Sequence, residues 1–176
     1  MTTLQATAPA TPPCAYVGLG ANLGRPGSTP RQTLAAAVDA IAALPLTRLH
    51  AASRVYVSDP VEASGPPFYN QIVRLHCELA AEPLLDELLA IEQRFSRERP
   101  YRNAPRTLDL DLLTWRDLRL QTPRLTLPHP RMHQRLFVLL PLAELDPHLV
   151  VPGHGPLAEC IAAVLASGTQ RCMPAA

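Results

Sequence analysis

Asp109 and Asp111 are the residues with the clearest chemical potential in this sequence of 176 residues. They stand two positions apart in the run 107–115, whose alternating leucines predict a strand, so both carboxylates are expected on one face of it. Two carboxylates about 7 Å apart at their Cα atoms repel each other unless a cation lies between them. Mg²⁺ takes one or two carboxylates together with phosphate oxygens. The pair therefore indicates a metal bridge to a polyphosphate, with an ordinary amphipathic strand as the alternative.

Arginines surround this pair. The chain has no lysine, and ten of its 16 arginines lie between residues 94 and 135, where only four acids stand against them. That window carries +6 and the rest of the chain −5, which gives the overall charge of +1. A Schiff-base lysine and a lysine-type phosphate loop are excluded, so guanidinium groups or backbone amides must bind any anion. This clustering of arginines predicts an anion-binding site, with a solvated surface as the alternative. The near-neutral total argues against a nucleic-acid partner.

Composition limits the class of protein further. The length fits one domain, and 47% apolar with 18% charged residues fits a globular chain. No apolar run approaches the roughly 18 residues of a membrane span, and no basic stretch followed by an apolar one opens the chain. The four cysteines form no C-x-x-C pair and are expected as reduced thiols. We expect a cytoplasmic monomer with no membrane partner.

The elements that position the aspartates follow from periodicity and turn signals. The sequence predicts, in order, a strand at 15–20, a helix at 30–44, strands at 47–58 and 71–79, a helix at 83–95 and a strand at 107–115. This β-α-β-β-α-β order predicts an α+β, ferredoxin-like fold, an antiparallel sheet with both helices packed on one face.

Additional elements are expected after this core. They are a short strand or hairpin near 117–127, a helix near 131–140 and a weak helix at 157–165. We expect residues 1–13 to be a disordered tail, 14–167 a single domain and 168–176 a frayed tail.

The run Pro105–Leu113, PRTLDLDLL, resembles the signature of the 6-hydroxymethyl-7,8-dihydropterin pyrophosphokinase family. Other segments are similar to that family in order and spacing: GLGANLG at 18–24, FYN at 68–70, IE at 91–92, LPHPR at 127–131 and RLFVL at 135–139. The resemblance covers roughly residues 15–155, with Ala21 where serine is usual.

The resemblance implies transfer of pyrophosphate from ATP to the hydroxymethyl group of 6-hydroxymethyl-7,8-dihydropterin, with release of AMP, in folate biosynthesis. It implies the ferredoxin-like fold and two Mg²⁺ ions held by Asp109 and Asp111, which bridge the three phosphates. Little covalent work is left for the protein, so catalysis would be positioning and electrostatics. ATP and the pterin are the expected partners.

The resemblance also assigns individual residues. Arg97 and Arg99 match a mobile arginine loop, and Arg97 and Arg106 join the two aspartates as catalytic residues. Backbone amides near Leu112 match those that read adenine. The full nucleotide-side set is Glu92, Arg99, Leu112, Arg124, Thr126, His129 and Arg135. A surface role for any one arginine and loop packing for His129 remain alternatives.

For the pterin, the matching positions are Ser58, Val61, Phe68, Asn70 and Phe137. Phe68 and Phe137 match two rings that sandwich the flat bicycle, although each could be a core residue. Asn70 offers both a donor and an acceptor to the pterin edge. Ser58 and Val61 match a loop whose backbone lines the same pocket.

This sequence also departs from the family pattern. Asp59 and Glu62 stand where proline and glycine are frequent, Asn103 replaces a tryptophan of some members, and Pro130 replaces a tyrosine. These departures leave the geometry of the loop at 59–67 open and predict a thinner aromatic lid over the site.

Two other functions fit the same topology. A two-metal nucleotidyl transferase or cyclase also mounts aspartates on such a sheet, but Phe68, Asn70 and Phe137 favour a small flat acceptor. An RNA-binding module would need aromatic residues on its central strands. The segments 71–79 and 107–114 contain none.

Overall fold

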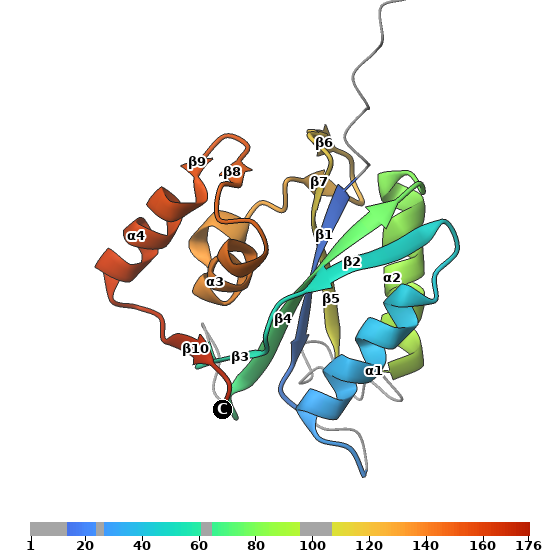
Figure 1. Cartoon of the computed structure of the whole chain (residues 1–176), viewed down its shortest axis with the longest axis horizontal. Helices are drawn as coiled ribbons and strands as arrows, with labels where there is room; N and C mark the ends of the chain where they lie inside the picture. The colour runs from blue at the N-terminus through green and yellow to red at the C-terminus, as the bar shows by residue number, and fades with distance from the viewer. Residues whose placement is uncertain (1–13, 24–26, 61–64, 96–106) are drawn as a thin grey trace, which may run out of the picture.

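The computed structural model describes residues 14–23, 27–60, 65–95 and 107–176. Its centre is an antiparallel sheet in which β1 (Cys14–Ala21) lies between β4 (Phe68–Cys77) and β5 (Asp109–Trp115). The other edge of β4 pairs with β2 (Thr47–Ala52) near its C-terminal end and with β3 (Tyr56–Ser58) near its start. A last strand, β10 (Cys172–Pro174), pairs with β3 (Figure 1).

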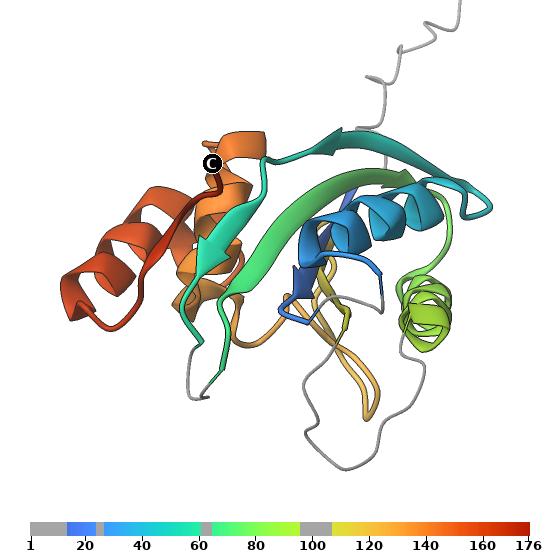
Figure 2. The ribbon, with the colours of Figure 1, turned by 90° about the horizontal axis from the view of Figure 1, so that it is seen from below.

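Two helices cover one face of this sheet, as predicted (Figures 1 and 2). They are α1 (Pro30–Ala42) and α2 (Ala81–Phe95). Thr29 caps α1, because its hydroxyl accepts the amide of Gln32 while the Gln32 side chain accepts the amide of Thr29. The apolar stripes of both helices and alternate side chains of the strands, such as Val17 and Leu110, form one buried cluster.

The C-terminal additions cover the opposite face. The short helix η1 (Met132–Gln134), α3 (Leu136–Leu145) and α4 (Leu157–Ser167) pack there. Their buried side chains meet Tyr16, Ile72 and Leu113, which point from the sheet away from α1 and α2. The sheet is therefore enclosed between two helical layers, and a site on its second face must lie beside α3.

Short hairpins complete the chain. The expected hairpin near 117–127 is present as β6 (Leu120–Gln121) and β7 (Thr126–Leu127). A second hairpin, β8 (Val150–Val151) and β9 (Gly155–Pro156), precedes α4 and was not predicted. In the described ranges, no helix combines the length and apolarity required for a membrane crossing.

The strand predicted at 47–58 is two strands. Ser53 still exchanges hydrogen bonds with Ile72 of β4, but the amide of Arg54 donates to the carboxylate of Glu144 in α3 at 2.9 Å. Since that amide no longer points to β4, the ladder stops and restarts at Tyr56. The hydrophobic pattern of the segment does not reveal a bond to a residue 90 positions away.

The predicted helix at 131–140 is divided as well. Arg135 has an extended backbone (φ −124°, ψ 109°), so η1 ends before it and α3 begins after it. The prediction of a frayed tail at 168–176 is wrong for Cys172–Pro174, which form β10. Main-chain pairing rather than side-chain burial holds this strand, because Met173 remains 60% exposed.

Candidate active site

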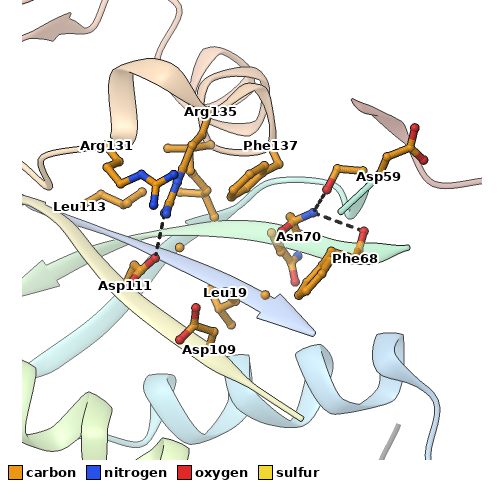
Figure 3. A pocket seen from close by; sticks show the side chains of 16 residues that line it. Leu19, Asp59, Phe68, Asn70, Asp109, Asp111, Leu113, Arg131, Arg135 and Phe137 are labelled. Atoms are coloured by element: carbon orange, nitrogen blue, oxygen red, sulfur yellow. Dashed lines mark hydrogen bonds and ion pairs between the residues drawn. The ribbon is translucent and has the colours of Figure 1, made fainter. Parts of the chain in front are cut away.

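A pocket opens on the sheet face that α3 covers only in part (Figure 3). Its floor follows from strand alternation, because side chains at every second position point to the same face. In register across the three central strands, Asn70 of β4 faces Gly20 of β1, and Gly20 faces Asp109 of β5. One step along, Gly18 lies between Ile72 and Asp111.

The two glycines keep this floor open. A methyl group at Gly20 would stand 3.6 Å from Oδ1 of Asn70 and 3.9 Å from Cβ of Asp109. Such a side chain would fill the space between the amide and the carboxylates. Because Gly18 and Gly20 carry no side chain, the pocket is continuous between its β4 and β5 sides.

Aromatic and amide groups line one end of the pocket. Phe68 and Asn70 belong to β4 and Phe137 belongs to α3. Asn70 lies between the two rings (Figure 3). Phe137 is nearly 70 residues away in the sequence from Phe68 and Asn70. A flat ring system could stack on these side chains, because aromatic faces favour offset stacking.

Charged groups line the other end. Asp109 and Asp111 stand on β5, and Arg131 and Arg135 reach toward them from the segment before α3 (Figure 3). A guanidinium nitrogen of Arg135 lies 3.6 Å from a carboxylate oxygen of Asp111, and the same guanidinium lies 5.5 Å from the ring centroid of Phe137. Arg135 thus touches both ends of the pocket, which makes it the link between them.

The orientation of Asn70 is fixed by its neighbours. Its amide nitrogen donates to Oγ of Ser58 at 3.0 Å and to the carbonyl of Phe68 at 3.3 Å. Asn70 and Ser58 are both about 95% buried. With both amide protons engaged, Oδ1 faces the Gly20 side as a hydrogen-bond acceptor.

Replacing Ser58 with alanine tests that orientation. The amide of Asn70 would lose one of its two acceptors and could rotate, so the pocket would no longer present a fixed carbonyl oxygen. We expect Ser58→Ala to weaken the binding of a ligand that carries an amine next to a ring N–H. The expected loss is about 1–2 kcal/mol, measured by calorimetry. Ser167→Ala, on the last turn of α4, is the control. Unchanged affinity in Ser58→Ala would contradict the role of Ser58.

Glu92, which the resemblance assigns to the nucleotide side, lies behind the strand that carries the aspartates. Its side chain is buried in α2 and does not line the pocket. One carboxylate oxygen accepts the amide of Leu110 at 2.6 Å. Leu110 is the residue between the two aspartates, so Glu92 fixes the strand segment that carries both of them from the opposite side of the sheet.

His129 lies just behind the charged end. Its amide donates to the carbonyl of Leu113 at 2.8 Å, and its Nδ1 accepts the amide of Arg131 at 3.2 Å, which leaves the proton of the neutral ring on Nε2. Burial lowers the pKa of His129; Asp111 opposes this shift, and the nearby arginines Arg135 and Arg131 reinforce it. The ring is therefore favoured in the neutral form, as a donor through Nε2.

Seven of the predicted site residues line this pocket together: Ser58, Phe68, Asn70, Asp109, Asp111, Arg135 and Phe137. None of the other predicted residues that the structure describes lines it. Leu112 points into the core under α1 and α2, and Arg124 is exposed and pairs with Asp86. Thr126 is exposed on β7. Val61, Arg97, Arg99 and Arg106 lie outside the described residues, as does the expected tail at 1–13.

Other pocket residues were not singled out as site residues from the sequence. Gly18 and Gly20 could have been found, because they alternate on a strand whose neighbours carry Asn70 and the aspartates. Arg131 stands inside the LPHPR segment but was not assigned a role. Asp59 was noted only as a departure from the family. The remaining ones are Leu19, Gln71, Ile72, Leu113 and Val138.

The donor set at the charged end fits a hard divalent cation that brings other ligands with it. Asp109 and Asp111 supply carboxylate oxygens on one strand face, next to open pocket volume. Among the described residues, no cluster of three or more His, Cys, Asp or Glu side chains could hold a metal unaided. Mg²⁺ commonly uses one or two carboxylates plus substrate phosphates, which is the combination that this geometry leaves room for.

Comparisons with known proteins give consistent matches. A family model described as 7,8-dihydro-6-hydroxymethylpterin-pyrophosphokinase matches residues 16–147. A 2-amino-4-hydroxy-6-hydroxymethyldihydropteridine pyrophosphokinase from Pseudomonas aeruginosa is 46% identical over 157 residues, covering 89% of this chain and 94% of its own. One of the same name from Haemophilus influenzae is 40% identical over 148 residues, covering 84% and 90%.

A solved structure supports the fold. A chain described as HPPK-DHPS in complex with substrates superposes with a TM-score of 0.71 at 12% identity. It covers 92% of this chain, which in turn spans 46% of that longer protein. With the family model matching most of its length, the chain belongs to the 7,8-dihydro-6-hydroxymethylpterin-pyrophosphokinase family.

Proposed function

We propose that the pocket between the sheet and α3 transfers pyrophosphate from ATP to the hydroxymethyl group of 6-hydroxymethyl-7,8-dihydropterin. The family activity is pyrophosphoryl transfer in folate biosynthesis. One observation carries the assignment to this pocket: a single sheet face joins an aromatic and amide end to an end with paired carboxylates and arginines. A flat acceptor and a polyphosphate can thus meet above Gly18 and Gly20.

The acceptor end suits a pterin. Phe68 and Phe137 would stack on the bicycle, and Oδ1 of Asn70 would accept from its amine or ring N–H. The hydroxymethyl group then points toward β5, because the aromatic end and the aspartates lie on opposite sides of the β1 glycines. Val61, in the loop after Ser58, completes this end in the proposal.

The donor end suits the phosphates of ATP. In the proposal, Asp109 and Asp111 would hold two Mg²⁺ ions. These ions would neutralise charge on the phosphates. Arg135 already lies 3.6 Å from Asp111, and a bound phosphate would give its guanidinium a second partner. Arg97, Arg99 and Arg106 would approach the same phosphates from the segment 96–106.

The reaction exchanges one P–O bond for another and releases the proton of the hydroxyl group to solvent. The hydroxymethyl oxygen attacks the β-phosphorus and loses its proton, while the bond from that phosphorus to the oxygen of the α-phosphate breaks and AMP leaves. The protein contributes alignment and charge stabilisation rather than covalent chemistry. In the proposal, Glu92, the backbone near Leu112, Arg124, Thr126 and His129 belong to the nucleotide side.

The finer fold assignment belongs to the same proposal. Strands β2, β4, β1 and β5 lie in that order with α1 and α2 on one face. This supports a ferredoxin-like core within a single domain, to which α3, α4 and β10 are additions. Neither the strand order nor the pocket requires a second copy of the chain.

Replacing Phe137 with alanine tests the acceptor end. Loss of stacking and buried area should weaken pterin binding by about 1–3 kcal/mol, whereas the affinity for an ATP analogue should hardly change because the aspartates are intact. Phe68→Ala should behave in the same way. Equal losses for both ligands would indicate general damage to the fold instead.

Calorimetric titration tests the function as a whole. We expect the protein to bind a non-hydrolysable ATP analogue with Mg²⁺ and then the hydroxymethyl pterin. A nucleotidyl transferase or cyclase would bind the nucleotide without any pterin, and an RNA-binding module would bind a short RNA. Binding of the RNA, or binding of the nucleotide with no binding of the pterin afterwards, would overturn the proposal.

A further inference from the structure

The residue that links the two ends of the pocket, Arg135, has an unusual setting. It separates η1 from α3 with an extended backbone, and its side chain makes no capping bond to α3. The first amides of a helix need acceptors from elsewhere, and an uncapped start leaves them unsatisfied. The positions of Arg135 and of Phe137, two residues further along the chain, therefore depend on what holds the start of α3.

Gln170 supplies the missing bonds from the far end of the chain. Its Oε1 accepts the amide of Leu136 at 2.9 Å, and its Nε2 donates to the carbonyl of Gln134 at 2.7 Å. One side-chain amide thus clamps the peptide groups on both sides of Arg135. Both distances are those of well-formed hydrogen bonds.

The residues after Gln170 hold the opposite wall of the pocket. The carbonyl of Arg171 accepts the amide of Asp59 at 3.3 Å. Cys172 pairs with Ser58, the residue that fixes the amide of Asn70, where β10 runs along β3 (Figure 1). A segment of three residues, 170–172, therefore contacts the acceptor wall and the start of α3 at once.

We infer that Gln170 is a positioning residue for the acceptor end of the pocket, and that the C-terminal segment sets the distance between its two walls. This inference rests on the proposed function, since it concerns how the pterin is held. Gln170 does not line the pocket, so its effect must pass through the start of α3 and reach the ligand by way of Arg135 and Phe137.

A double-mutant cycle on the full-length protein separates positioning from simple stabilisation. We expect Gln170→Ala to raise the dissociation constant for the pterin, measured with Mg²⁺ and an ATP analogue bound, about 5- to 10-fold. Thr169→Ala is the matched control, since among the described residues its side chain bonds only to Ser167; it should change the constant less than twofold. Contacting or coupled residues give non-additive cycles. In a Phe137→Ala background, Gln170→Ala should therefore have less than a twofold effect.

Gln170→Glu provides a second variant, because it keeps the acceptor for Leu136 and loses the donor to Gln134; we expect a smaller rise than in Gln170→Ala. Hydrogen exchange at the Leu136 amide of the ligand-free protein should be faster in Gln170→Ala. Unchanged exchange, or an equal fold-change in both backgrounds, would overturn the inference. Absence of pterin binding by the wild-type protein, or an unchanged dissociation constant for the pterin in Phe137→Ala, would overturn the proposed function instead.

Discussion

Replacing Asp111 with asparagine should lower kcat by about 10²- to 10³-fold at saturating Mg²⁺. The substitution keeps the size of the side chain but removes one negative charge from the only D-x-D pair in the sequence. A weaker hold on the cation leaves the charge that develops on the phosphates less well neutralised. Asp109→Asn should have a similar effect, because both carboxylates stand on one strand face.

The control for Asp111→Asn is Asp117→Asn. Asp117 is exposed just after β5 and lies outside the pocket, so its replacement removes the same charge from the same part of the chain. Steady-state rates with varied Mg²⁺ distinguish the two variants. Near-normal turnover of Asp111→Asn at saturating Mg²⁺ would contradict the assignment of the metal site.

Replacing Arg135 with alanine should reduce kcat by about 10²-fold, an effect comparable to removing one oxyanion donor. Arg135 is the cation next to Asp111, and it also lies over Phe137, so the substitution acts on both ends of the pocket. Arg135→Lys should recover part of the rate, because it restores the charge without the planar fork. Affinity for the pterin should fall less than turnover.

Arg119→Ala is the matched control for Arg135→Ala, since it is an exposed arginine of the same basic window and lies outside the pocket. Rapid-quench or steady-state measurements of AMP release give kcat for each variant. If Arg135→Ala and Arg119→Ala lowered kcat equally, the effect would come from general positive charge and not from the position of Arg135.

Local sequence patterns were sufficient for the elements that carry the site. Alternation over 107–112 placed both aspartates on one face, and the structure confirms that Leu110 and Leu112 are buried behind them. The predicted helix start at residue 30 is also confirmed, because the Thr29 cap that sets it is a local feature of the sequence.

The errors have a common physical cause, since each depends on bonds between distant segments. The break at Arg54 depends on Glu144, and the order of the last residues depends on pairing with β3. Neither contact leaves a periodic signal in the sequence. The position of Glu92 behind β5 also follows from tertiary packing, so a match to a family segment could suggest its importance but not its orientation.

The pocket could be predicted only in part, because it also depends on the pairing of distant segments. Asn70 and Asp109 could each be placed on a strand, but the sequence alone did not bring their two strands into register on either side of Gly20. Register depends on the whole sheet, and a slip by one position would send every side chain to the other face.

Product analysis tests the central claim most directly. The protein is incubated with ATP, Mg²⁺ and 6-hydroxymethyl-7,8-dihydropterin, and the nucleotide products are separated by chromatography. Pyrophosphoryl transfer predicts AMP and a pterin pyrophosphate in equal amounts, with no AMP when the pterin is omitted and a rate reduced about 10²-fold or more in Asp111→Asn. Formation of ADP instead of AMP, or AMP release that does not depend on the pterin, would contradict it.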